Sequence, residues 1–290
     1  MVTINVVAVL GAGVMGNGIA QIASQAGYQV YMYDVDAKAL EKGFASIKSS
    51  LGRMAAKGKL TQADADKVFA NIKGTLDMKE AVGKADLVIE AAPEVLELKQ
   101  KIFKQLDEFC PAHTILATNT SNCSITAIGA ATKRPQSVIG MHFANPVPMM
   151  RGVEMIKGLD TSEEVTQAAK DVIVKMGKDY FVAQDYPGFS GNRGFMVFLN
   201  ENFEVAREGI ASPADIDKNY RLSFSHPLGP FELADLIGLD QLLHGLEYLN
   251  SQYGDKYLPS QLLKKMVAAG YYGRKTGRGF YRYNEKGEKL

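Results

Sequence analysis

The sequence predicts an α/β fold: a doubly wound, Rossmann-like sheet with an inserted helical hairpin, followed by a smaller all-α domain. In the first part of the chain, short apolar runs alternate with segments of helical spacing, as in a parallel sheet with crossover helices. After Pro187-Gly188 the strand-like runs nearly stop. We therefore place the domain boundary between residues 1–186 and residues 187–290.

The first part opens with a β-α-β unit. Residues 4–10 form an apolar run that ends at Gly11, which is typical of a strand buried on both faces. A helical pattern follows, and residues 28–33 indicate a second strand. Helical spacing over residues 36–72, broken near residues 57–59, predicts the inserted hairpin. Similar runs predict strands at 87–89, 115–117, 138–141, 153–156 and 180–183, and a crossover helix at 96–109.

The part beyond the boundary is expected to be helical. Five segments have the start signals or the apolar spacing of helices. They are residues 195–207, 213–219, 231–237, 240–248 and 260–268.

Composition restricts the class of protein. Lys and Arg number 33 against 32 Asp and Glu, a net charge of +1, so no overall field favours nucleic acid and an anionic ligand needs a local cluster. Cys110 and Cys123 lack the spacing of metal ligands, and no metal is expected. We expect two reduced thiols in a cytoplasmic protein, with a disulfide as the lesser alternative. We expect neither an export signal nor a membrane span.

A glycine-rich turn predicts a dinucleotide site. Gly11, Gly13 and Gly16, with Val14 and Met15 between them, form a GxGxxG motif at the junction of the first strand and helix. An isolated match is weak and often marks only a tight turn. Here the strand, the helix and a later acidic residue are in register, so backbone N–H groups are expected to hold a pyrophosphate.

Asp34 follows the second strand, where a carboxylate accepts hydrogen bonds from the adenosine ribose. Its charge would repel a 2′-phosphate, which favours NAD over NADP. Asp36 is an alternative ribose partner, but we favour it as the N-cap of the next helix.

His142 is the candidate base for oxidation of an alcohol, because a histidine titrates near neutral pH and this one follows a predicted strand at the ligand-binding edge of the sheet. His113, His226 and His244 lie in turns or helical patterns that suit structural or surface roles. Glu154, in the next predicted strand, is expected to hold one ring nitrogen of His142, although an unrelated surface position fits the pattern equally well.

Two polar residues are candidates for binding the substrate. Ser121 follows another strand and is expected to donate to the substrate oxygen; a hydroxyl-rich turn that only caps a helix is the alternative. Asn192 is expected in the first helical turn after a Ser190 cap, a position where Asn is commonly structural.

These residues resemble the L-3-hydroxyacyl-CoA dehydrogenase family. The segment His142-Phe143-Ala144-Asn145-Pro146-Val147-Pro148, with Glu154 twelve positions after His142, is similar to the family signature. The resemblance extends over nearly the whole chain. Its other motifs are Gly11 to Gly16, Ile89 to Glu94 with Lys99, Thr118 to Ser121, Pro187 to Arg193, His226 to Pro230, and Gly273 to Tyr281.

The resemblance implies an NAD-dependent oxidation of short-chain L-3-hydroxyacyl-CoA, such as (S)-3-hydroxybutyryl-CoA, and the reverse reduction. His142 is then the base, Glu154 its partner, and Ser121 and Asn192 position the substrate. Ala92, Glu94, Lys99, Ser121 and Asn145 are the further cofactor contacts that it implies. It also implies a homodimer joined through the helical domain.

The hairpin is the candidate handle for coenzyme A. Residues 36–67 carry seven Lys or Arg against four acids, and Ser50 and Lys57 are seven residues apart, on one helical face. A solvated basic helix is the competing interpretation. Two other functions remain as alternatives: a related dehydrogenase of a free hydroxy acid or sugar acid, and a non-catalytic NAD-binding or structural protein.

Overall fold

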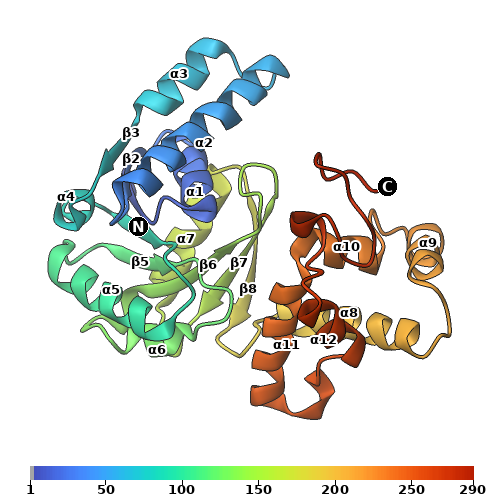
Figure 1. The fold of residues 1–290 in the computed structure, drawn as a ribbon. Coiled ribbons are helices and arrows are strands. Elements are labelled where there is room, and N and C mark those ends of the chain that lie inside the picture. The colour runs from blue at the N-terminus through green and yellow to red at the C-terminus, as the bar shows by residue number, and fades with distance from the viewer. Residues whose placement is uncertain (1–2) are drawn as a thin grey trace. The chain divides into compact units, whose positions relative to one another are not determined.

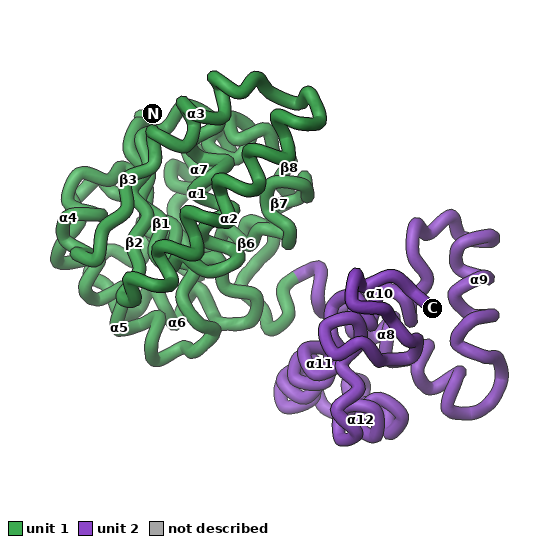
Figure 2. The backbone as a smooth tube through the Cα atoms, turned by 45° about the horizontal axis from the view of Figure 1, so that its top comes forward, with its two compact units in different colours: residues 1–189 green, residues 190–290 purple. Residues whose placement is uncertain are grey.

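The structure is a computed structural model and describes residues 3–290. The chain forms two compact units, residues 1–189 and residues 190–290, which are coloured separately in Figure 2. Within the described part of the chain, no helix has both the length and the apolar composition that a bilayer span requires.

The first unit is built on an eight-stranded sheet of order β3-β2-β1-β4-β5-β6-β7-β8 (Figure 1). Neighbouring strands are parallel except β6 and β7, which pair antiparallel. This order confirms the predicted Rossmann-like, doubly wound sheet. The strands are β1 (Val6–Leu10), β2 (Gln29–Tyr33), β3 (Ile72–Thr75), β4 (Leu87–Glu90), β5 (Ile115–Thr118), β6 (Val138–Phe143), β7 (Gly152–Lys157) and β8 (Asp179–Gln184).

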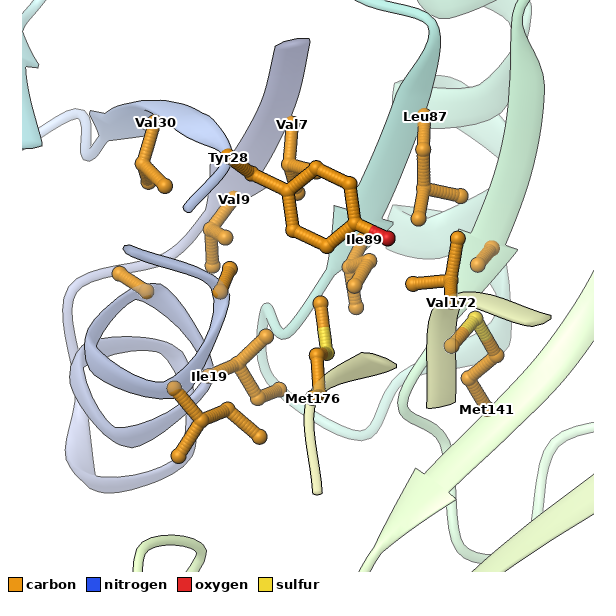
Figure 3. Close-up of a cluster of buried hydrophobic side chains, with 14 of the residues drawn as sticks. Val7, Val9, Ile19, Tyr28, Val30, Leu87, Ile89, Met141, Val172 and Met176 are labelled. Atoms are coloured by element: carbon orange, nitrogen blue, oxygen red, sulfur yellow. The ribbon is translucent and has the colours of Figure 1, made fainter. Parts of the chain in front are cut away.

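Helices cover both faces of this sheet. Successive residues of a strand point to opposite faces, so Val7 and Val9 of β1 join one hydrophobic core and Ala8 and Leu10 join the other. The first core includes side chains of α1 (Val14–Gln25), α2 (Ala37–Ala56), α3 (Gln62–Ala70) and α7 (Glu163–Lys175); Figure 3 shows part of it. The second includes α4 (Met78–Val82), α5 (Leu96–Phe109) and α6 (Ile125–Gly129).

The inserted hairpin consists of α2 and α3, and it is shorter than predicted. Residues 72–75 belong to the edge strand β3 and α4 follows directly, whereas the helical pattern predicts a hairpin as far as residue 72. The strand Ile-Lys-Gly-Thr has only its two end residues buried, so its sequence carries little strand signal. Gly58, in the predicted break, has a φ of +67°, which favours glycine.

The second unit contains five α-helices over residues 190–290, at the five predicted segments, and two short 3-10 helices, Asp255–Tyr257 and Arg274–Thr276. The α-helices are α8 (Gly191–Arg207), α9 (Pro213–Ser223), α10 (Pro230–Ile237), α11 (Leu239–Tyr253) and α12 (Gln261–Ala268). Helix α8 begins four residues before the predicted start, and α11 extends five residues beyond the predicted end. Leu199, Phe203, Phe231 and Leu246 are among the fully buried residues at the centre of this unit.

Two buried carboxylates fasten the segment after α12 to the helices. Asp235 of α10 accepts hydrogen bonds from the backbone N–H groups of Phe280 and Tyr281 and from the Tyr283 hydroxyl. Each of the three donor–acceptor distances is 2.9 Å. Asp217 of α9 accepts one from the Tyr281 hydroxyl over 2.6 Å. Burial raises the pKa of both carboxyls above the ordinary aspartate value, against the opposing effect of these hydrogen bonds.

Candidate active site

The turn between β1 and α1 has the geometry of a phosphate-binding loop. Gly11 adopts a φ of +99°, and a β-carbon at Gly16 would overlap the Gly11 carbonyl oxygen. No atom lies within 4 Å of the position of a β-carbon at Gly13, so a ligand has room to approach the backbone there. The three glycines therefore permit a tight turn, close approach of a ligand and close packing of helix on strand.

Asp34 lies beside this turn. One carboxylate oxygen accepts the Ala12 backbone N–H over 2.8 Å, and the other accepts that of Asp36 over 3.0 Å. Asp36 accepts the Lys38 N–H over 2.9 Å and is the N-cap of α2, which confirms the favoured interpretation of this residue.

A cavity of about 1050 Å³ opens between this turn and α5. Gly11, Gly13 and Asp34 line one side of it, and its other walls are largely apolar side chains. The size, the apolar walls and the few polar groups at one end suit the adenosine half of a dinucleotide. The remaining lining residues include Val14, Met15, Met78, Ala92, Leu98 and Ile102.

Next to the lining residues Ala91 and Ala92 lies a buried cluster of charges. The sequence analysis names Glu94 and Lys99 but does not predict their pairing with Glu90. Glu90 is 0% exposed and Lys99 is 1% exposed. The Lys99 ammonium lies 2.8 Å from Glu90 Oε1 and 3.5 Å from Glu94 Oε2, and it donates to the Ala92 carbonyl oxygen over 3.2 Å. Lys99 is thus enclosed by protein groups behind Glu94, whereas the resemblance implies a direct contact with the cofactor.

Glu94 holds the turn that follows β5. Its Oε1 accepts hydrogen bonds from the Thr120 hydroxyl over 2.5 Å, the Ser121 N–H over 2.8 Å and the Asn122 N–H over 2.7 Å. Burial raises the pKa of the Glu94 carboxyl, but these bonds and the Lys99 charge outweigh burial and leave the pKa below the usual value. Glu94 therefore fixes the turn as a carboxylate.

Ser121, His142 and Glu154 form a continuous row. His142 and Glu154 are directly paired on β6 and β7, and His142 Nδ1 lies 3.2 Å from Glu154 Oε2. On the other side of the ring, Nε2 lies 3.0 Å from Ser121 Oγ. The Glu154 side chain is 4% exposed and that of His142 is 21% exposed, so the acid is buried behind a ring that solvent reaches. The structure thus brings together three predicted residues.

β6 extends to Phe143, two residues beyond the predicted run, and His142 therefore lies within the strand instead of following it. The antiparallel register explains the contact with Glu154, because directly paired residues present their side chains on the same face of a sheet. The Phe189 ring packs near the imidazole, with 6.3 Å between the ring centroids.

The loop between β6 and β7 carries Asn145, which is exposed. Lys178, just before β8, holds this loop: its ammonium donates to the Val147 carbonyl oxygen over 2.6 Å and to the Met150 carbonyl oxygen over 2.7 Å. Burial lowers the pKa of Lys178. No pattern in the sequence indicates this clamp.

The other predicted site residues lie elsewhere. Ser50 is half-buried on α2, and Lys57 is the exposed C-cap of the same helix. Asn192 belongs to the second unit, in the first turn of α8, with Ser190 at the N-cap position as predicted.

The three remaining histidines are exposed. His113 and His244 are exposed, and His113 Nε2 lies 3.0 Å from Asp86 Oδ1. His226 is exposed and packs against the rings of Phe198 and Tyr220.

The chain is similar to proteins of known family. Residues 6–186 match the family model "3-hydroxyacyl-CoA dehydrogenase, NAD binding domain", and residues 188–283 match "3-hydroxyacyl-CoA dehydrogenase, C-terminal domain". The "Probable 3-hydroxybutyryl-CoA dehydrogenase" of Bacillus subtilis is 49% identical over 279 residues, which are 96% of this chain and 97% of that protein. The 3-hydroxybutyryl-CoA dehydrogenase of Clostridioides difficile is 40% identical, with coverage of 96% and 99%. The crystal structure of the (S)-3-hydroxybutyryl-CoA dehydrogenase of Ralstonia eutropha matches with a TM-score of 0.94 and 46% identity, covering 98% of this chain and 100% of that chain.

Proposed function

Because the chain belongs to the 3-hydroxyacyl-CoA dehydrogenase family and has its NAD-binding domain, we propose that it oxidises (S)-3-hydroxybutyryl-CoA to the 3-oxoacyl-CoA and catalyses the reverse reduction. The observation that carries this proposal is the row Ser121–His142–Glu154 beside a dinucleotide-type cavity. The proposed domains are residues 1–186 and residues 187–290, and the limits of the two family models support this division.

His142 is the proposed general base. Nε2 takes the proton of the C3 hydroxyl during oxidation and returns it as the general acid during reduction. NAD, held by the residues around the Gly11–Gly16 turn, would supply the acceptor for the hydride that leaves C3. Glu154 holds the ring through Nδ1, and Ser121 donates a hydrogen bond to the substrate oxygen. Asn192 is the proposed partner of the thioester.

The residues of the first unit fit NAD. The open position over Gly13, the carboxylate of Asp34 and the apolar cavity suit the phosphates, the ribose and the adenine respectively. We propose that Lys99 acts on the cofactor through Glu94 and the Ala92 carbonyl, since its ammonium is buried. The proposed cofactor residues are Gly11, Gly13, Val14, Met15, Gly16, Asp34, Ala92, Glu94, Lys99, Ser121 and Asn145.

The hairpin is the proposed site for coenzyme A. Its excess of basic side chains suits the phosphates of that ligand, with Ser50 and Lys57 as contacts. Exposed Leu222, Phe224 and Leu236 in the second unit support a homodimer joined through it, since exposed apolar side chains mark interfaces. Both cysteines are free thiols, which supports a cytoplasmic location.

The test is the loss of nicotinamide absorbance when the purified protein is mixed with NADH and acetoacetyl-CoA. NADPH and free acetoacetate serve as parallel alternatives. We expect rapid oxidation of NADH with the thioester only. Reaction with the free acid alone would support a hydroxy-acid dehydrogenase, and no reaction in any mixture would support a non-catalytic protein.

A further inference from the structure

Glu90 joins three elements beneath the proposed site. It ends β4, and its Oε1 accepts the Ala92 backbone N–H over 2.6 Å and the Lys99 ammonium over 2.8 Å. Its Oε2 accepts the Thr118 hydroxyl of β5 over 2.6 Å. Both carboxylate oxygens are therefore used, and no part of the side chain is exposed.

Lys99 connects Glu90 to Glu94. Because its ammonium lies between the two carboxylates, at 2.8 Å and 3.5 Å, its position depends on the attraction of both. Removing the charge of Glu90 would leave Glu94 as its one carboxylate partner among the described residues and would draw the ammonium toward Glu94 Oε2.

Glu94 transmits this position to the reacting groups. Its other oxygen, Oε1, accepts the N–H groups of Ser121 and Asn122, and Ser121 Oγ lies 3.0 Å from His142 Nε2. A continuous series of hydrogen bonds and ion pairs thus leads from Glu90 to the imidazole.

We propose that Glu90 is a positioning residue for the dehydrogenase reaction, which acts through Lys99 and Glu94 to hold the Ser121 hydroxyl against His142. The inference rests on the proposed function. A contribution to stability alone explains the arrangement poorly, because a buried ion pair is often no more stabilising than apolar side chains of similar volume.

The variant Glu90→Gln tests this role, since it keeps the size and one acceptor oxygen but removes the charge. We expect kcat for NADH oxidation by acetoacetyl-CoA to fall about 10- to 100-fold, as for residues that orient a reacting ligand. KM for acetoacetyl-CoA should change little, because no atom of Glu90 is exposed to a ligand.

A double-mutant cycle with Ser121→Ala distinguishes positioning from stability. If Glu90 acts through Ser121, the double variant Glu90→Gln/Ser121→Ala should have a kcat close to that of Ser121→Ala alone, because the effects of mutations at coupled residues do not add. If the two losses multiply, the inference is wrong.

Asp107→Asn is the matched control. Asp107 lies near the other end of the same helix, α5, and forms a largely buried ion pair with Arg134, with 2.9 Å between Oδ1 and Nε. This variant should lower Tm and leave kcat unchanged below the transition. If Glu90→Gln does not fold, the double variant Glu90→Gln/Lys99→Met replaces it. This double variant removes both charges and leaves no unpaired ammonium, and we expect the same loss of kcat.

The inference fails if either folded Glu90 variant retains kcat within about twofold of wild type, well below the expected effect. A wild-type protein without activity on the thioester would contradict the proposed function itself. An active wild type with an unaffected Glu90→Gln would contradict only the role of Glu90.

Discussion

His142 Nδ1 lies 3.2 Å from the carboxylate of Glu154, and the two residues face each other across antiparallel strands. The Glu154 carboxylate is buried and holds Nδ1, so that Nε2 of the same ring faces Ser121. In Glu154→Gln, we therefore expect kcat for hydroxyacyl oxidation to fall, but by less than in a variant without the imidazole, because the amide oxygen can still accept a hydrogen bond from Nδ1. Initial rates with saturating substrate measure the loss. An unchanged kcat would remove Glu154 from the mechanism.

Replacement of the proposed base should be more severe. We expect His142→Ala to lose about 10²- to 10⁴-fold in kcat, the usual contribution of a general base. The circular dichroism spectrum should remain that of the wild type, because the ring is partly exposed and β6 is held by the backbone pairing of the sheet. Turnover near the wild-type rate would exclude His142 as the base.

The choice between NAD and NADP depends on Asp34. In Asp34→Ala we expect kcat/KM with NADH to fall by about 10- to 150-fold, the equivalent of a charged hydrogen bond worth about 1.5–3 kcal/mol, while NADPH becomes a better substrate.

The neighbouring variant Asp36→Ala is the control. It removes a helix cap, so it should cost about 0.5–2 kcal/mol of stability and leave the NADH/NADPH ratio unchanged. A changed ratio in this variant would restore Asp36 as the ribose partner.

Lys178 is expected to stabilise the loop between β6 and β7. In Lys178→Met the buried Val147 carbonyl loses its ammonium donor, and an unsatisfied buried acceptor costs about 1–3 kcal/mol. Urea denaturation should show a loss of this size. Because the loop carries Asn145, KM for NADH should also rise. Exposed Lys84 serves as a control, and Lys84→Met should change neither quantity; equal effects in both variants would contradict a specific clamp.

The Cys110 thiol should be unreactive in the folded protein. Burial raises the pKa of Cys110 to about 12, and burial followed by the charge of Glu94 raises that of Cys123. At pH 8 only about one Cys110 in 10⁴ is then a thiolate, the form that reacts, and the fraction rises as the pH increases toward 12. Iodoacetamide should label Cys110 in Cys123→Ser only after unfolding. Rapid labelling of the native protein at pH 8 would disprove this.

The candidate cofactor residues can be identified from the sequence because they lie close together along the chain. The three glycines lie at the junction of β1 and α1, and Asp34 directly follows β2, the second strand of the same β-α-β unit. His142 and Glu154 are also predictable as candidates, since His142 follows one apolar strand-like run and Glu154 lies within the next. Their contact requires the antiparallel register of β6 and β7, which the sequence pattern does not reveal.

The supporting residues are not predictable in the same way. Glu90 looks like the polar end of an apolar run, and Lys178 looks like a surface lysine between a helix and a strand. Glu90 accepts a hydrogen bond from Thr118, which is 28 positions away in the sequence, and Lys178 donates one to Val147, which is 31 positions away. Such long-range pairings are set by the topology of the sheet. The sequence does not indicate β3 for a local reason, because a short edge strand with Lys and Gly at its centre has no alternating apolar pattern.

The two carboxylates of the second unit have a consequence for biosynthesis. Asp217 precedes the Tyr281 hydroxyl that it binds by 64 residues, and Asp235 precedes its tyrosine partners by 46 and 48. While a ribosome is still translating α11 and α12, the donors of Tyr281 and Tyr283 do not yet exist. Burial of the two aspartates at that stage therefore has a free-energy cost that those hydrogen bonds would otherwise offset. The first unit can complete its sheet once β8 has emerged, as domains generally do in order during synthesis. The second unit is instead expected to complete its packing only after Tyr281 and Tyr283 have left the ribosome, and until then it remains accessible to solvent and to chaperones.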